Sequence, residues 1–117
     1  MWDIYHIFCD LKPGVRDLDF TNKVHTYLGK LQSDGLIEAF RITRRKLGLG
    51  IAGMPEFHIW IETTGMGQLE SAFQVVSSRA DPVEELHHAV NSLVENATFG
   101  LYRDFPDTQR KRGDERF

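Results

Sequence analysis

The order in which the spacing of apolar residues changes along the chain limits its fold more than any other feature. Residues 2–11 alternate in a strand-like pattern rich in β-branched and aromatic side chains, and a Lys-Pro-Gly turn at residues 12–14 ends that run. Alternation returns over residues 36–46 and 56–63, with a glycine-rich hairpin loop between them. Between the first two strands, helical spacing links Phe20, Val24, Tyr27, Leu28 and Leu31.

Helical spacing returns twice in the second half of the chain. Leu69, Ala72, Phe73 and Val76 predict a second helix. A third helix is expected to begin at Pro82 and to carry an apolar stripe that runs on to Val94; residues 97–105 form the last expected strand. The expected helix-terminal residues are Asp17 or Asp19 and then Gly35 for the first helix, and Asp81 with Glu84 for the third.

This order predicts an α+β fold, a ferredoxin-like βαββ(αα)β domain. Right-handed crossovers would place all helices on one face of a four-stranded antiparallel sheet, with strands 2–11 and 56–63 central and adjacent. We therefore expect a single ferredoxin-like domain over residues 1–105, followed by a polar C-terminal tail over residues 106–117.

Composition narrows the possible partners and location. With 117 residues, 41% of them hydrophobic, the chain can bury one core. The net charge of −3 offers no general attraction for nucleic acid, and no apolar run is long enough to span a membrane. A single cysteine, Cys9, cannot form an internal disulfide and is expected to be buried. We expect a cytoplasmic protein without nucleic-acid or membrane partners.

The strand at residues 56–63 has two contrasting faces. Phe57, Ile59 and Ile61 suit a core, whereas the opposite positions hold aromatic and ionisable residues. If helices cover only one face of the sheet, the other face is exposed. A large exposed apolar surface of this kind indicates an interface with another molecule. We expect a homodimer in which two sheets face each other around a cavity. The expected residues of the exposed face are Ile4, His6, Phe8, Arg41, Thr43, Glu56, His58, Trp60, Glu62 and Tyr102.

Candidate site residues come from this exposed face. His6 and His58 are the candidate catalytic residues, because imidazole suits a general base near neutral pH; the alternative is that both are hydrogen-bonded interface residues. The candidate ligand-binding residues, which could instead fill the dimer core, are Trp60, Tyr102, Arg41, Phe8 and Glu62. Two imidazoles with Glu56 or Glu62 could hold a metal, but without a local ligand motif we expect neither metal nor cofactor.

Other motifs favour structural roles. Gly48, Gly50 and Gly53 match a dinucleotide-binding glycine pattern, but a strand follows instead of the helix that such a site needs. The basic run at residues 44–46 could meet phosphate there, although a solvated strand end is the simpler interpretation. His25, His87 and His88 are expected on helix surfaces.

Three segments of the chain are similar to a known family: IYHIFCDLKPGV, FGLYRDF and ADPVEEL. They resemble the stress-responsive α/β-barrel domain of the dimeric α/β-barrel superfamily, in which ADPVEEL stands at the place of a His-Pro-x-His motif. The resemblance implies a dimer, with His6 at the position of the family's first-strand histidine. Some members of this superfamily are cofactor-free monooxygenases of aromatic polyketides, polyketide cyclases or haem-degrading enzymes. The cyclase histidine is replaced here by Glu84, and the first histidine of that motif by Asp81.

Three hypotheses follow for the function. One is a cofactor-free enzyme acting on a small aromatic or hydrophobic molecule. A second is a non-catalytic dimer that binds a hydrophobic ligand or haem, and the third is a stress-linked structural dimer whose cavity is filled by side chains.

Overall fold

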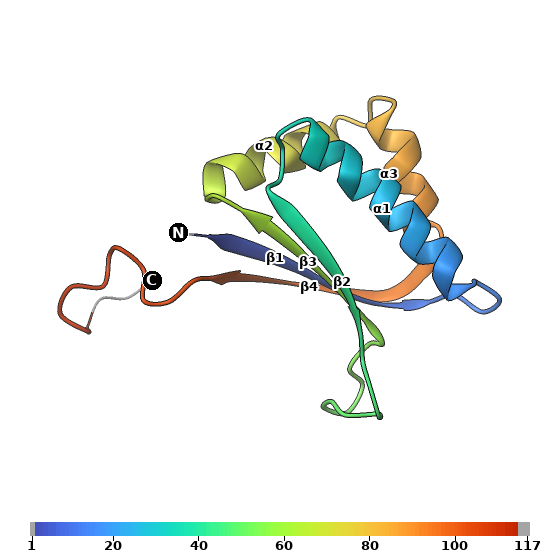
Figure 1. Cartoon of the computed structure of the whole chain (residues 1–117), viewed down its shortest axis with the longest axis horizontal. Helices are drawn as coiled ribbons and strands as arrows, with labels where there is room; N and C mark the ends of the chain where they lie inside the picture. The colour runs from blue at the N-terminus through green and yellow to red at the C-terminus, as the bar shows by residue number, and fades with distance from the viewer. Residues whose placement is uncertain (1, 115–117) are drawn as a thin grey trace.

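The computed structural model describes residues 2–114, and its elements follow the predicted order βαββααβ (Figure 1). The sheet order is β2-β3-β1-β4, and every neighbouring pair is antiparallel, so the predicted ferredoxin-like topology is confirmed. The bounds are β1 Asp3–Leu11, α1 Asp17–Ser33, β2 Ala39–Arg44, β3 Phe57–Thr63, α2 Met66–Ser77, α3 Val83–Asn91 and β4 Val94–Arg103.

The hydrophobic core lies between the sheet and the helices. Because side chains alternate along a strand, the odd-numbered residues of β1 and β3 face this core, and the predicted burial of Cys9 is confirmed. Phe20 of α1 packs against Phe57 of β3 with ring centroids 5.1 Å apart. All three helices lie on the same side of the sheet (Figure 1), so the even-numbered residues of β1 and β3 face away from the helical layer.

Four local predictions were wrong. β2 spans Ala39–Arg44 rather than residues 36–46. β4 begins at Val94 rather than residue 97. Val94 pairs with Leu11 of β1 and so belongs to the strand instead of the apolar stripe of the third helix. Arg16 is the N-cap residue of α1, and Asp17 instead accepts a hydrogen bond from the backbone N–H of Leu18. α3 begins at Val83 rather than Pro82, although Asp81 does accept a hydrogen bond from the backbone N–H of Glu85.

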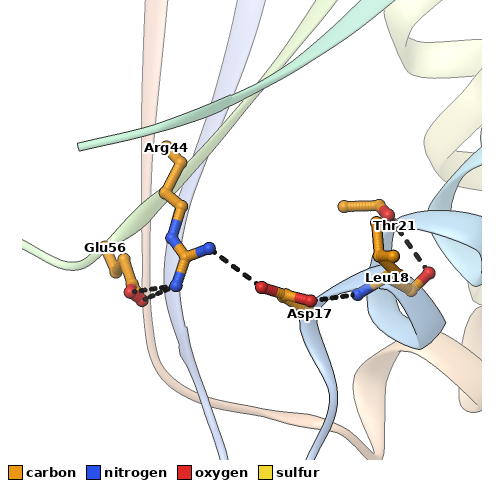
Figure 2. A network of polar contacts seen from close by, with 5 residues as sticks. All are labelled: Asp17, Leu18, Thr21, Arg44 and Glu56. Carbon is orange, nitrogen blue, oxygen red and sulfur yellow. Dashed lines mark hydrogen bonds and ion pairs between the residues drawn. The ribbon is translucent and has the colours of Figure 1, made fainter. Parts of the chain in front are cut away.

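Glu56 is also placed differently from its prediction. It precedes β3, and its carboxylate accepts hydrogen bonds from Arg44, whose guanidinium also donates to Asp17 at the start of α1 (Figure 2). The Arg44 guanidinium lies 5.2 Å from the ring centroid of Phe57, a core residue. Glu56 is therefore tied to the helix side of the sheet and does not join the exposed face.

The protein is a thin slab with two projections. Its principal dimensions are 52 × 37 × 18 Å, and its radius of gyration of 15.7 Å exceeds the roughly 13 Å typical of a compact chain of this length. The β2–β3 loop and residues 104–114, which contain no helix or strand, both extend away from the sheet (Figure 1). Residues 115–117 of the predicted tail and residue 1 of the predicted domain lie outside the described residues.

Candidate functional site: a histidine pair on the open sheet face

A pair of histidines lies at the centre of the sheet face that the helices leave uncovered, which we call the open face. His6 of β1 and His58 of β3 lie on adjacent strands with the same side-chain parity, and the register pairs His6 with Trp60. Nδ1 of His6 and Nε2 of His58 are 2.6 Å apart, which is hydrogen-bond distance. The predicted proximity of the two candidate catalytic residues is therefore present in the structure.

Aromatic rings enclose the pair. His58 stacks on Phe8 and on Trp60, with ring centroids 4.2 Å and 4.5 Å apart. The Tyr102 ring of β4 meets His6 edge to face at 4.7 Å. Three of the five candidate ligand-binding residues thus join the two histidines in one cluster, which we call the aromatic cluster: His6, Phe8, His58, Trp60 and Tyr102.

Burial sets the charge state of both histidines. His6 is 6% exposed, and burial lowers the pKa of its imidazole. Burial lowers the pKa of His58 as well, and the neighbouring His6 lowers it further. Both rings therefore favour the neutral form near neutral pH, in which each imidazole has one donor and one acceptor nitrogen.

One nitrogen of the pair is left over. Among residues 2–114, the buried Nε2 of His6 has no hydrogen-bond partner. When Nδ1 of His6 donates to His58, Nε2 carries a lone pair and can accept a proton; in the other tautomer it carries a hydrogen that it can donate. A buried polar atom without a partner costs free energy, so it marks a position that a ligand could satisfy.

Hydrogen bonds from β2 hold the other side of the cluster. The indole N–H of Trp60 donates to the hydroxyl of Thr43 at 3.1 Å, and that hydroxyl donates to the backbone carbonyl of His58, also at 3.1 Å. This chain of bonds fixes the Trp60 ring against His58. The orientation of the stacked rings is thus determined by β2 as well as by β1 and β3.

The remaining two candidates lie at the margin of the open face. Arg41 is exposed and lies opposite Trp60 in the β2–β3 register, whereas Glu62 is half-buried and lies opposite Ile4. Within residues 2–114, no group of three or more His, Cys, Asp or Glu side chains is placed to hold a metal ion. In the same part of the chain, no helix has the length and apolar content to cross a membrane.

A cavity on the opposite side of the sheet was missed by the sequence analysis. Its volume is about 300 Å³, and it lies between the helices and strands β1, β3 and β4. Its lining is mainly apolar, with Tyr27 and His87 among its polar members; their rings are 5.4 Å apart. Burial raises the pKa of Tyr27 to about 12, with smaller contributions from Tyr5 and Glu84.

The three helix histidines are not all surface residues. His25 and His88 are exposed as predicted, but His87 is half-buried against Tyr27. The sequence indicated Tyr27 as a member of an apolar stripe and nothing more. A half-polar pair such as Tyr27 and His87 becomes recognisable as a cavity wall only when the packing of α1 against α3 is known.

Similar solved structures confirm the fold. The Arabidopsis thaliana protein At3g17210 has a TM-score of 0.68 at 11% identity, over 87% of this chain and 94% of that one. A dimeric ferredoxin-like protein of unknown function from Jannaschia sp. CCS1 has a TM-score of 0.64 at 8% identity, over 89% and 100%. SnoaB of Streptomyces nogalater, a cofactor-independent oxygenase, has a TM-score of 0.66 at 8% identity, over 91% and 98%.

The resemblance to dimeric ferredoxin-like proteins is therefore confirmed at the level of the fold. No curated protein matches the chain in sequence. A family profile does match, over residues 2–117, and it covers nearly the whole sequence. The chain belongs to this family, a family of unknown function (DUF6614).

Proposed function

We propose that the protein is a homodimeric small-molecule enzyme that binds an aromatic or hydrophobic substrate between two open sheet faces. The observation that carries the proposal is the 2.6 Å bond between His6 and His58, which leaves the buried Nε2 of His6 without a partner among residues 2–114. The fold shared with dimeric proteins, and with one cofactor-independent oxygenase, supports both the dimer and the reaction class.

In this proposal His6 is the general base and His58 positions it. When Nε2 of His6 takes a proton from the substrate, its ring becomes an imidazolium whose Nδ1–H donates to Nε2 of His58. The bond holds the ring orientation and stabilises the charge that develops, as a second group does for other catalytic histidines. Trp60 and Phe8 provide the aromatic surface on which a flat substrate stacks.

The proposal also assigns Tyr102 the role of controlling access to the base. Nε2 of His6 is buried within the single chain, and the exposed Tyr102 ring lies 4.7 Å from the His6 ring. In this proposal, rotation of Tyr102 away from His6 admits the substrate. The exposed Arg41, one strand beyond Trp60, is placed to bind an enolate or carboxylate of that substrate.

The test measures oxygen consumption with dithranol, a tricyclic phenolic ketone with an acidic C–H group. Proton removal gives an enolate, and oxidation of its CH₂ to a carbonyl by O₂ releases water. We expect turnover by the wild type, a loss of at least about 100-fold in His6→Ala and in His58→Ala, and an unchanged rate in His88→Ala, which alters an exposed residue of α3. Full activity of both site variants would contradict the assignment.

A second candidate is non-catalytic binding in the helix-side cavity. The observation that favours it is the apolar volume of about 300 Å³, which suits a small hydrophobic molecule. Fluorescence of 1-anilinonaphthalene-8-sulfonate should then be enhanced by the wild type, unaffected in His58→Ala and lost in Val76→Phe, because Val76 lines this cavity. The reverse pattern would place the bound molecule on the open face.

A further inference from the structure

The loop that joins β2 and β3, residues 45–56, has an apolar surface that the proposed site does not explain. Its three aliphatic side chains are strongly exposed: Leu47 at 90%, Leu49 at 73% and Ile51 at 76%. No charged residue lies between Lys46 and Glu56. Single exposed aliphatic residues are common, but three at alternate positions of one loop form a patch, and such patches mark contact surfaces.

Hydrogen bonds within the loop define its shape. Its base is closed by the backbone bond from Arg45 N–H to the Glu56 carbonyl, and the Arg45 guanidinium donates to the Met54 carbonyl. Two tight turns follow, with bonds from Leu49 N–H to Lys46 and from Met54 N–H to Ile51. The loop is therefore a preformed structure rather than an extended connection.

The interior of the loop is already occupied. Met54 is half-buried, and a Cβ added at Gly50 would approach its sulfur to 2.8 Å, so the space inside the loop is filled by Met54. Leu47 has a φ of 57°, in the left-handed region that leucine rarely adopts. The loop thus retains a strained backbone at a residue whose side chain is exposed, and none of its three aliphatic residues is buried within the protomer.

The position of the loop indicates what covers it. The loop extends from the sheet on the side opposite the helices, which is the side of the open face (Figure 1). β2 ends one residue after Thr43, and β3 begins one residue before His58. The loop between these two strand ends therefore borders the aromatic cluster. No helix of the described residues covers this face, and a second copy stacked on it would meet the loop (Figure 1).

We infer that the β2–β3 loop of each protomer packs against the open face of a second copy and forms an apolar wall beside the partner's aromatic cluster. The inference deepens the proposed function and rests on its face-to-face dimer. In the inferred dimer, the two-fold axis that pairs the two faces passes near the aromatic cluster, which is the apolar centre of the open face. A loop that borders this centre in one protomer then borders it in the other.

The first test measures the dimer dissociation constant by sedimentation equilibrium of the full chain. The variant Leu47→Ser/Leu49→Ser/Ile51→Ser should raise this constant at least about tenfold, because it removes exposed apolar area from both copies. The matched control is Leu18→Ser, which alters an equally exposed leucine of α1 and should leave the constant unchanged. Circular dichroism would verify that both variants keep the wild-type fold.

The second test places the loop beside the partner's site. One chain carries Leu49→Cys with a nitroxide label plus Trp2→Phe and Trp60→Phe; the other carries Trp2→Phe, so its Trp60 is the only emitter. Cys9 is buried and burial raises the pKa of its thiol to about 11, so the label reacts at position 49. The labelled chain is mixed in large excess, so that nearly all emitting chains pair with it; quenching of the partner's Trp60 by at least half then supports the inference.

The outcomes separate this inference from the function it rests on. An unchanged dimer constant in the loop variant, together with no quenching of the partner's Trp60, overturns the inference and leaves the dimer standing. A monomeric wild type overturns both the inference and the proposed dimer. A third outcome would assign the loop to a lipid surface and also overturn the inference. In it, the wild type binds vesicles of phosphatidylcholine and phosphatidylglycerol, and the loop variant loses that binding but keeps the wild-type dimer dissociation constant.

Discussion

The lowered pKa values of His6 and His58 predict that the protein loses stability in mild acid. Between the folded and the unfolded pKa, the unfolded chain binds more protons than the folded chain, so the free energy of unfolding rises with pH. The stability from these neutral rings is fully present above pH 6.5, the ordinary histidine pKa. It is lost as the pH falls below that value towards the lower folded pKa values.

The upper limit of the effect follows from the unfolded chain. At pH 5.5 an unfolded histidine is roughly nine-tenths protonated. A ring that stays neutral in the folded chain therefore lowers the free energy of unfolding by about 1.2 kcal/mol relative to pH 7. If both rings stay neutral, the two together cost about 2.5 kcal/mol. Aspartate and glutamate side chains ordinarily titrate near pH 4, which is below this window.

Urea unfolding at pH 7.0 and pH 5.5, at one protein concentration, measures this difference. His6→Phe/His58→Phe keeps aromatic rings at both positions and removes the titration, so its difference should be smaller than that of the wild type by up to about 2.5 kcal/mol. His88→Gln alters an exposed histidine and serves as the control. The reasoning would be refuted by a double variant whose pH dependence equals that of the wild type.

Three further predictions concern named contacts. Arg103→Leu should lower the urea midpoint of unfolding, because the carboxylate of Asp3, 3% exposed, loses a bidentate partner. Asp3→Leu/Arg103→Leu should recover much of that loss, and an equal loss in both variants would contradict the account. Arg44→Ala should lower the urea midpoint much less than Arg103→Leu, because the ion pairs in Figure 2 are exposed to water, which weakens them. Cys9 should react with 5,5′-dithiobis(2-nitrobenzoic acid) only as fast as the chain opens, because the thiol is buried and its pKa is raised to about 11; rapid labelling of the native protein would contradict this.

The sequence predicts the fold well because each element has a clear spacing of apolar residues. The alternation of Phe57, Ile59 and Ile61 also predicts which face of β3 enters the core. Boundaries are less predictable: Val94 fits the spacing of the preceding helix and that of a strand equally well. Its antiparallel pairing with Leu11 decides between them, and that contact joins residues far apart in the sequence.

The candidate site was predictable only in part. Equal parity on adjacent central strands was enough to bring His6 and His58 to the same face. The hydrogen bond between them depends on ring orientations that Phe8, Trp60 and Thr43 determine together, which no local pattern contains. The helix-side cavity depends on how closely the helices pack against β4, so spacing along the chain gives no measure of its volume.

The register of β1 connects stability with the candidate site. Neighbouring residues of a strand face opposite sides, so a slip by one residue would turn His6 into the helix-side core and Tyr5 onto the open face. Polar contacts at both ends of β1 oppose such a slip. At one end, Asp3 binds Arg103 through its carboxylate and Thr63 through its carbonyl; at the other, the Asp10 carboxylate accepts the backbone N–H of Glu56.

These contacts are distant from the aromatic cluster along the strand, yet they determine which residues compose it. The ion pair joins the buried Asp3 to the half-buried Arg103, and it contributes little net stability compared with apolar residues of the same size because both charges lose water. The ion pair instead favours one register of β1 against β4, because only that register places the Asp3 carboxylate opposite the Arg103 guanidinium. That register also places Ile4 opposite Tyr102, a member of the aromatic cluster. The β1–β3 register, which includes the bond from the Thr63 hydroxyl to the Asp3 carbonyl, aligns His6 with Trp60 and beside His58. Contacts of Asp3 with both neighbouring strands therefore act as positioning contacts for the aromatic cluster.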